Sequence, residues 1–143
     1  MRRDGWKTAL GILAAGTILL GCFVPIIYGA YALYDKGDRQ IIEANLMDTP
    51  ENVYKTAVAA MEERGGKIAE RNDKEMFLSG KSKGGQDGTL KVSGLPAGGS
   101  KLTITLEKGK DPKAEREEIV NTVLATCSKL GIQCSEQKEK ENK

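Results

Sequence analysis

Hydrophobic and polar residues divide this chain into an apolar front, a patterned middle and a charged end. Every residue from Thr8 to Tyr34 is uncharged. Across residues 39–134, apolar residues recur with the spacings of strands and amphipathic helices, which predicts one compact domain. Residues 135–143 contain no apolar residue and are predicted to form a disordered charged tail.

The strand candidates alternate between apolar and polar residues. The clearest pattern places Leu102, Ile104 and Leu106 on one side, and Thr103 and Thr105 on the other. Short segments rich in Gly, Asn, Asp and Pro separate the candidates, as turns do. We expect strands over Gln40–Leu46, Lys67–Arg71, Met76–Lys81, Thr89–Ser93 and Lys101–Glu107.

Two amphipathic helices are predicted from their end signals. The first has Thr49 as its N-cap and Pro50 in its first turn, and Gly65-Gly66 end it. The second begins at Asp111-Pro112 and ends at Gly131. Their apolar faces are expected to contain Val53, Ala57, Ala60 and Met61 in the first helix, and Ile119, Val120, Val123, Leu124, Cys127 and Leu130 in the second.

This order of elements predicts an α+β fold. Short turns between the middle strands favour antiparallel pairing. Two amphipathic helices need one apolar surface to cover, so we expect both on one face of a sheet of about four to five strands. The other face would carry polar residues such as Thr103 and Thr105.

The front of the chain has the layout of a bacterial lipoprotein signal. A basic head is followed by an uncharged run, and Leu19-Leu20-Gly21-Cys22 matches a lipobox. We therefore predict that residues 1–21 are a cleaved signal peptide and that Cys22 is the lipid attachment site. The apolar segment 22–38, rich in Gly, Ala and Tyr, would then lie next to the membrane. Tyr28, Tyr31 and Tyr34 are expected at the level of the lipid headgroups, with an aromatic docking stripe as the alternative.

Apolar character continues past Cys22, which leaves a second interpretation open. As one helix, Thr8–Tyr34 would be roughly 40 Å long, enough to cross a bilayer. Pro25 would interrupt that helix, although membrane helices tolerate proline. The alternative is an uncleaved inner-membrane anchor with the domain in the periplasm.

Charge adds one exclusion. The formal net charge is +2, and it comes from residues 1–21, where Arg2, Arg3 and Lys7 outnumber Asp4. The remainder of the chain carries equal numbers of basic and acidic residues. A neutral domain without excess Lys and Arg argues against a nucleic acid as the partner.

The chain has three cysteines, and an odd count in an exported protein needs an explanation. Lipidation of Cys22 accounts for one and leaves Cys127 and Cys134. On a continuing helix their Cα atoms would lie roughly 10 Å apart, too far for a disulfide. Because Gly131 allows the chain to reverse after the helix, we predict a Cys127–Cys134 disulfide, favoured by an oxidising compartment. Two free thiols are the alternative.

The chain resembles a family of short bacterial envelope lipoproteins with a single α+β domain of unknown function. The resemblance implies a lipid-anchored domain in the Gram-negative envelope, with no assigned activity. Phe23 after Cys22 is similar to lipoproteins sent to the outer membrane. The Cys127/Cys134 pair departs from the family pattern. The resemblance is carried by Gly21-Cys22, residues 28–37, Val53-Tyr54-Lys55-Thr56-Ala57, Asp87-Gly88-Thr89 and Ser100-Lys101-Leu102-Thr103-Ile104.

No enzyme chemistry is predicted. The chain has no histidine, which excludes Ser/His and Cys/His nucleophile systems, and the glycines of residues 80–99 form no phosphate-binding motif. We expect no catalytic, cofactor-binding or metal-ligating residues. Two functions remain: a lipid-anchored binding or scaffold protein facing the periplasm, attached to the membrane through acylated Cys22 and the apolar segment, or an accessory subunit of a larger membrane complex that spans the bilayer once. Both imply a protein partner, which the sequence does not name.

Overall fold

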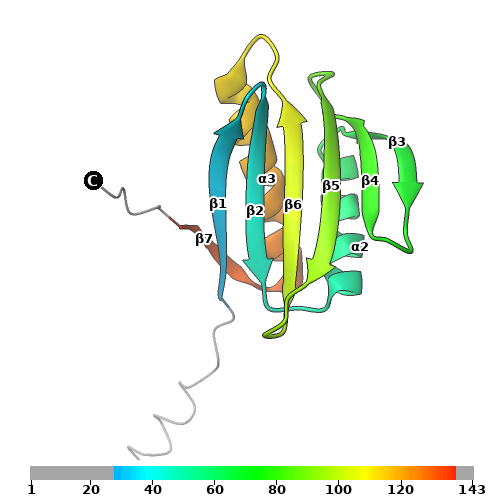
Figure 1. Cartoon of the computed structure of the whole chain (residues 1–143), viewed down its shortest axis with the longest axis vertical. Coiled ribbons are helices and arrows are strands. Elements are labelled where there is room, and N and C mark those ends of the chain that lie inside the picture. The colour runs from blue at the N-terminus through cyan, green and yellow to red at the C-terminus, as the bar shows by residue number, and fades with distance from the viewer. Residues whose placement is uncertain (1–27, 138–143) are drawn as a thin grey trace, which may run out of the picture.

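The structure is a computed structural model, and it describes residues 28–137. This part of the chain contains seven strands and two helices (Figure 1). The helices are α2 (Pro50–Glu63) and α3 (Pro112–Leu130). The strands are β1 (Tyr28–Lys36), β2 (Arg39–Leu46), β3 (Lys67–Asn72), β4 (Phe77–Lys81), β5 (Asp87–Gly94), β6 (Ser100–Glu107) and β7 (Gln133–Glu136).

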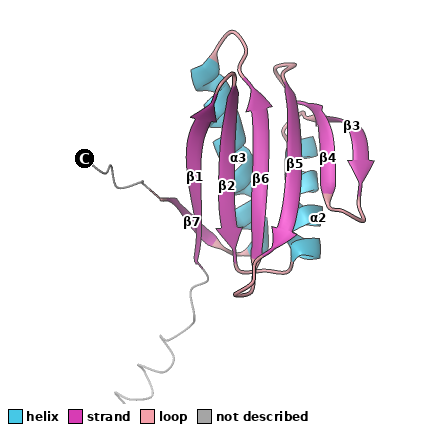
Figure 2. Cartoon of the chain, in the orientation of Figure 1, coloured by secondary structure: helices cyan, strands magenta, loops and turns pink. Residues whose placement is uncertain are grey.

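All seven strands belong to one sheet with the order β3-β4-β5-β6-β2-β1-β7. Neighbouring strands are antiparallel except β1 and β7, which run parallel. Both helices lie behind the same face of the sheet, and within residues 28–137 no helix lies across the opposite face (Figure 2). The predicted α+β class is thus confirmed, but the sheet has more strands than the expected four to five.

Strand β1 corrects the expected start of the domain near residue 39. Strand β1 comes from the segment that we expect next to the membrane, and its residues Ala30–Lys36 pair with β2. Tyr31, expected at the headgroups, is only 8 % exposed and belongs to the core. The pattern concealed this strand because its outward positions Ala30 and Ala32 are as uncharged as its inward ones. The predictions for residues 1–27, including the signal peptide and Cys22, and for the Tyr28 side chain lie outside the described part.

Strand β7 corrects the expected start of the charged tail. Ser135 and Glu136 pair with Ala30 and Tyr31 of β1, so they continue the sheet. A four-residue polar strand has no alternation to reveal it, and its pairing depends on the neighbouring β1. The remainder of the predicted tail, from residue 138, lies outside the described residues.

The predicted helix ends are confirmed. The Thr49 hydroxyl accepts a hydrogen bond from the backbone N–H of Asn52 at 3.3 Å, and the Asp111 carboxylate accepts one from Ala114 at 3.2 Å. Gly131 adopts the left-handed conformation with φ of 72°, which reverses the chain after α3.

One apolar core fills the space between the sheet and the helices. The helix-facing positions of the central strands are almost completely buried, and they pack against buried side chains of α2 and α3. The core strands contribute Ile42, Ala44, Leu46, Leu78, Leu90, Val92, Leu102, Ile104 and Leu106, and the helices contribute Val53, Tyr54, Ala57, Val58, Ile119, Val123 and Cys127. All polar side chains that alternate with these strand residues therefore point to the uncovered face.

Candidate functional site

The uncovered face of the sheet is the candidate site, and strand register builds it from aligned rows of side chains. One row begins with the pair Ser79 and Thr89, continues through the pair Thr89 and Thr105, and reaches Ile41, the register partner of Thr105. Tyr34 lies opposite Ile41 at one end, and Glu70 lies opposite Ser79 at the other. We call this the hydroxyl row, defined as Glu70, Ser79, Thr89, Thr105, Ile41 and Tyr34.

A second row flanks the hydroxyl row and consists of long charged side chains. Lys81 lies opposite Asp87, and their side chains form an ion pair at 2.8 Å. Arg39 lies opposite Glu107 on the neighbouring strands. Both signs of charge are therefore present in this row, with the two acidic residues on the adjacent strands β5 and β6 and a basic residue on the strand at either side.

A shallow concavity of about 370 Å³ lies where the two rows meet. Its floor contains Ser79, Thr89 and Thr105, and its walls contain charged side chains of the flanking row. The hollow arises because three short side chains sit side by side on adjacent strands and are bordered by long ones. Its lining residues are Arg39, Ala69, Ser79, Gly80, Lys81, Asp87, Gly88, Thr89, Thr105 and Glu107.

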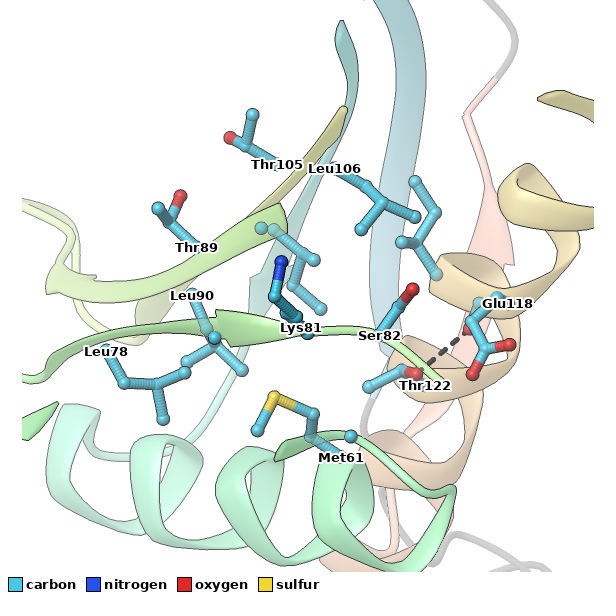
Figure 3. Close-up of a pocket in the computed structure, with 15 residues that line it drawn as sticks. Met61, Leu78, Lys81, Ser82, Thr89, Leu90, Thr105, Leu106, Glu118 and Thr122 are labelled. Carbon is cyan, nitrogen blue, oxygen red and sulfur yellow. Dashed lines mark hydrogen bonds between the residues drawn. The ribbon is translucent and has the colours of Figure 1, made fainter. Parts of the chain in front are cut away.

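On the helix side of the same region, two glycines leave the sheet without side chains. Gly80 and Gly88 lie opposite each other, on the face that also carries Leu78 and Leu90. Figure 3 shows Thr89 and Thr105 pointing away from the helices, while Leu78 and Leu90 point toward them. The gap holds a cavity of about 50 Å³, whose lining surface is mainly apolar. That volume suits a few water molecules at most and is too small for an organic ligand.

Two tyrosine hydroxyls, those of Tyr34 and Tyr54, donate hydrogen bonds to carboxylates. Tyr34, 39 % exposed, donates to Glu43 at 3.1 Å on the uncovered face. Burial and this hydrogen bond raise the pKa of Tyr34. Tyr54 of α2 donates to Asp73 at 2.9 Å, and Arg71 donates to the same carboxylate oxygen. Hydrogen bonds from Arg71 and Tyr54 lower the pKa of Asp73.

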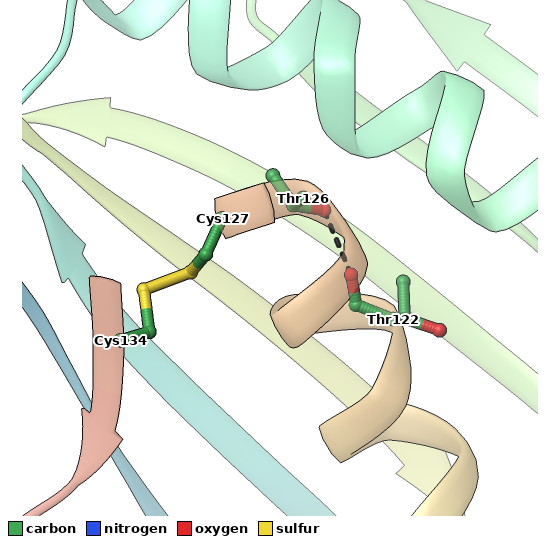
Figure 4. The surroundings of a disulfide bond; sticks show 4 residues. All are labelled: Thr122, Thr126, Cys127 and Cys134. Carbon is green, nitrogen blue, oxygen red and sulfur yellow. Dashed lines mark hydrogen bonds between the residues drawn. A yellow bond between two sulfur atoms is a disulfide. The ribbon is translucent and has the colours of Figure 1, made fainter. Parts of the chain in front are cut away.

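The predicted disulfide is present and joins Cys127 of α3 to Cys134 of β7 (Figure 4). The Cα atoms of the pair are 6.2 Å apart, because the reversal at Gly131 returns the chain to the last helical turn. Cys127 is 2 % exposed. Beside the disulfide, a Cβ added to Gly29 would lie 2.8 Å from the Cys134 sulfur. The disulfide therefore fixes the outermost strand and leaves room only for glycine beside it.

Two searches of the described residues bear on other kinds of site. Within residues 28–137, no group of three or more Cys, Asp or Glu side chains is arranged to hold a metal ion. Neither helix in this range is long and apolar enough to span a bilayer.

The sequence predicts Thr103 and Thr105 on a polar face, but it does not predict the hydroxyl row. Ser79 and Thr89 were within predicted strands, so their outward direction followed from alternation. Their alignment with Thr105 depends on the register of three strands, which the sequence does not specify.

Comparison with known proteins adds no family. The chain matches no protein-family model, and a search of curated proteins found no match either.

Proposed function

We propose that this chain is a lipid-anchored, non-catalytic protein of the Gram-negative envelope that binds a partner protein through the uncovered face of its sheet. Its anchor is the acylated Cys22, and its domain faces the periplasm from the outer membrane. The lipobox and Phe23 support the proposed location at the outer membrane, and the disulfide is consistent with an oxidising compartment. The uncovered seven-stranded sheet supports the binding role.

The chemistry of the uncovered face favours a protein as the partner. Basic and acidic side chains are interspersed on it, and a surface of mixed sign selects a partner by complementary charge. A nucleic acid would instead need a basic surface. The basic members are Lys36, Arg39, Lys67, Lys81, Lys91 and Lys101, and the acidic members are Glu43, Glu70, Asp87 and Glu107.

Hydroxyl groups and two aromatic rings add contact chemistry to this face. Ser79, Thr89 and Thr105 can donate and accept hydrogen bonds. Tyr34 and Phe77 lie near the two sides of the sheet, where β1 and β4 place them. Aromatic side chains contribute large contact areas at protein interfaces. The face therefore has the mixed polar and aromatic composition of a protein-binding surface.

Photocrosslinking in intact cells tests the face directly. A photoreactive amino acid replaces Thr103, at the centre of the uncovered face, and in a matched chain it replaces Asn121, on the exposed surface of α3. We expect one discrete crosslinked protein from position 103 and none from position 121. Crosslinking from position 121 alone, or from neither position, would contradict binding through the sheet.

A further inference from the structure

The described domain has two unlike ends, and one of them is where the chain enters from the apolar front. At this end β1 begins at Tyr28 and β2 ends at Leu46, as the pairing of Ala30 with Asn45 requires. Strand β6 begins beside it, because Leu46 pairs with Ser100. Figure 1 shows β1 beginning at this end, where β2 ends and β6 begins. We call it the tether end.

The connections that close the tether end carry exposed apolar side chains. Met47 is 60 % exposed, which makes it the most exposed large hydrophobic side chain among residues 28–137. The turn between β5 and β6 contains half-buried Leu95 and exposed Pro96 and Ala97. These two connections touch, because a Cβ added to Gly99 would lie 3.3 Å from the Met47 sulfur. We call Met47, Leu95, Pro96 and Ala97 the apolar tip.

Charge is nearly absent from the apolar tip. The connections 47–49 and 95–99 contain one charged residue, Asp48. Its carboxylate accepts hydrogen bonds from the Thr49 N–H at 2.7 Å and from the Asn52 side chain at 3.0 Å. The charged turn between β3 and β4 is set back, because Phe77 pairs with Lys91, three residues before the end of β5.

The opposite end of the sheet has the reverse character. Its connections include residues 82–86 and 108–111, which carry Lys83, Lys108, Lys110 and Asp111. Strand ends beside them add Lys36 and Arg39. An apolar end and a strongly charged end therefore face opposite directions along the strands.

Chain length places the apolar tip near the bilayer. Tyr28 is only six positions after Cys22 in the sequence, and a chain of that length reaches at most about 20 Å. A lipid attached at Cys22 therefore holds the tether end close to the headgroups. Apolar side chains presented there gain free energy by entering the interface.

We propose that the apolar tip contacts the lipid surface beside the anchor, so that the domain stands on the bilayer with its charged end outward. This inference rests on the proposed lipid anchor. Contact at the tether end orients the strands upright on the membrane surface. The uncovered face then points parallel to the membrane and is accessible to a partner in the same envelope compartment.

Tryptophan fluorescence in vesicles tests the contact with the acylated chain that begins at Cys22. Trp6, the only tryptophan, is removed with residues 1–21, and it is also replaced by phenylalanine so that any uncleaved chain does not fluoresce. Single tryptophans are then introduced as Met47→Trp and Ala97→Trp in the tip, and as Lys83→Trp at the charged end for the matched control. The vesicles contain phosphatidylethanolamine and phosphatidylglycerol, with or without brominated acyl chains.

We expect brominated lipid to quench both tip tryptophans at least about twofold, because an interfacial side chain enters the headgroup and acyl boundary by about 5–10 Å. The Lys83→Trp chain should keep its full emission. Flotation with the vesicles reports the anchor separately. Chains that float with equal quenching at all three positions would overturn the lipid contact and leave the anchor standing. Chains that fail to float would overturn the anchor, and the lipid contact with it.

Discussion

Cys127 and Cys134 hold the outermost strand onto the helix layer. Their disulfide closes a loop with a sequence separation of seven residues. Cys127 is fully packed in the core, whereas Cys134 sits beside Gly29 of β1. The bond thus joins α3 to the neighbouring β7 and packs against β1, which is remote from both in sequence, so a short covalent loop affects the edge of the whole sheet.

Reducing this disulfide should lower the free energy of unfolding by about 2–3 kcal/mol, the loop-entropy value for so short a ring. Urea unfolding of the oxidised and reduced Cys22→Ser chain measures the difference, since that chain retains only this cysteine pair. Thiol titration of the unfolded, unreduced chain is the control. Two reactive thiols before reduction, or identical urea midpoints, would contradict the prediction.

Asp73 should make stability depend on acid pH. Its pKa is lowered from 3.8 by hydrogen bonds from Arg71 and Tyr54, so the folded state favours the carboxylate. The stabilisation is complete above the unfolded pKa and is lost as pH falls through the lower folded value. Asp73→Asn should therefore lose less stability than the parent chain between neutral pH and pH values below 3.8.

Urea midpoints of the parent and Asp73→Asn chains, at neutral pH and at a pH below 3.8, measure this effect. Asp87→Asn is the matched control, because Asp87 is as exposed as Asp73 and also forms an ion pair, but accepts no hydrogen bond from a tyrosine in the described structure. Equal acid sensitivity of the Asp73→Asn and parent chains would refute the assignment.

At the scale of elements, the helices were predictable and the outer strands were not. Thr49, Asp111 and Gly131 act locally, so the sequence alone located the helix ends. Strands β1 and β7 depend on each other across a long sequence separation. The α3 face shows a second limit: Leu124 is 38 % exposed, whereas Thr126 is buried and its hydroxyl donates to the Thr122 carbonyl, which offsets the cost of burying it. A hydropathy pattern does not include such hydrogen bonds, so it does not predict that Thr126 is buried.

Removing β1 should destabilise the whole domain. A chain that begins at residue 28 retains every described strand and should unfold cooperatively. A chain that begins at residue 39 loses the buried Tyr31 and the neighbour of β7, at a cost of at least about 3 kcal/mol, comparable to truncating one large core side chain. Urea unfolding followed by circular dichroism compares the two chains. Equal urea midpoints would support the predicted start of the domain near residue 39 instead.

The close approach of β3 and β4 at Gly80 should tolerate no side chain. A Cβ there would clash with the Lys67 carbonyl oxygen and lie 3.1 Å from the Ile68 Cα, both backbone atoms. We expect Gly80→Ala to cost about 1–3 kcal/mol. Gly94→Ala is the matched control, because its Cβ would meet only Pro50 at 3.6 Å. Similar urea midpoints for the two variants would contradict this account.

At the scale of the whole molecule, the fold separates three surfaces by direction. The apolar tip points along the strands toward the chain entry, the charged end points the opposite way, and the hydroxyl row lies across the uncovered face between them. Sequence patterns supplied the fold class and the polar face, because both follow from local alternation. The rows and the two ends could not be predicted, since they depend on register and strand order.

The most direct test is the intact mass of the chain extracted from membranes of a Gram-negative host. The lipid anchor is the feature to test because it sets how each of the three surfaces is oriented relative to the membrane. We predict a polypeptide that begins at Cys22, carries acyl chains on that residue and contains the intact Cys127–Cys134 disulfide. A mass that includes residues 1–21 and no acyl chain would contradict the lipid anchor and support the single-pass alternative.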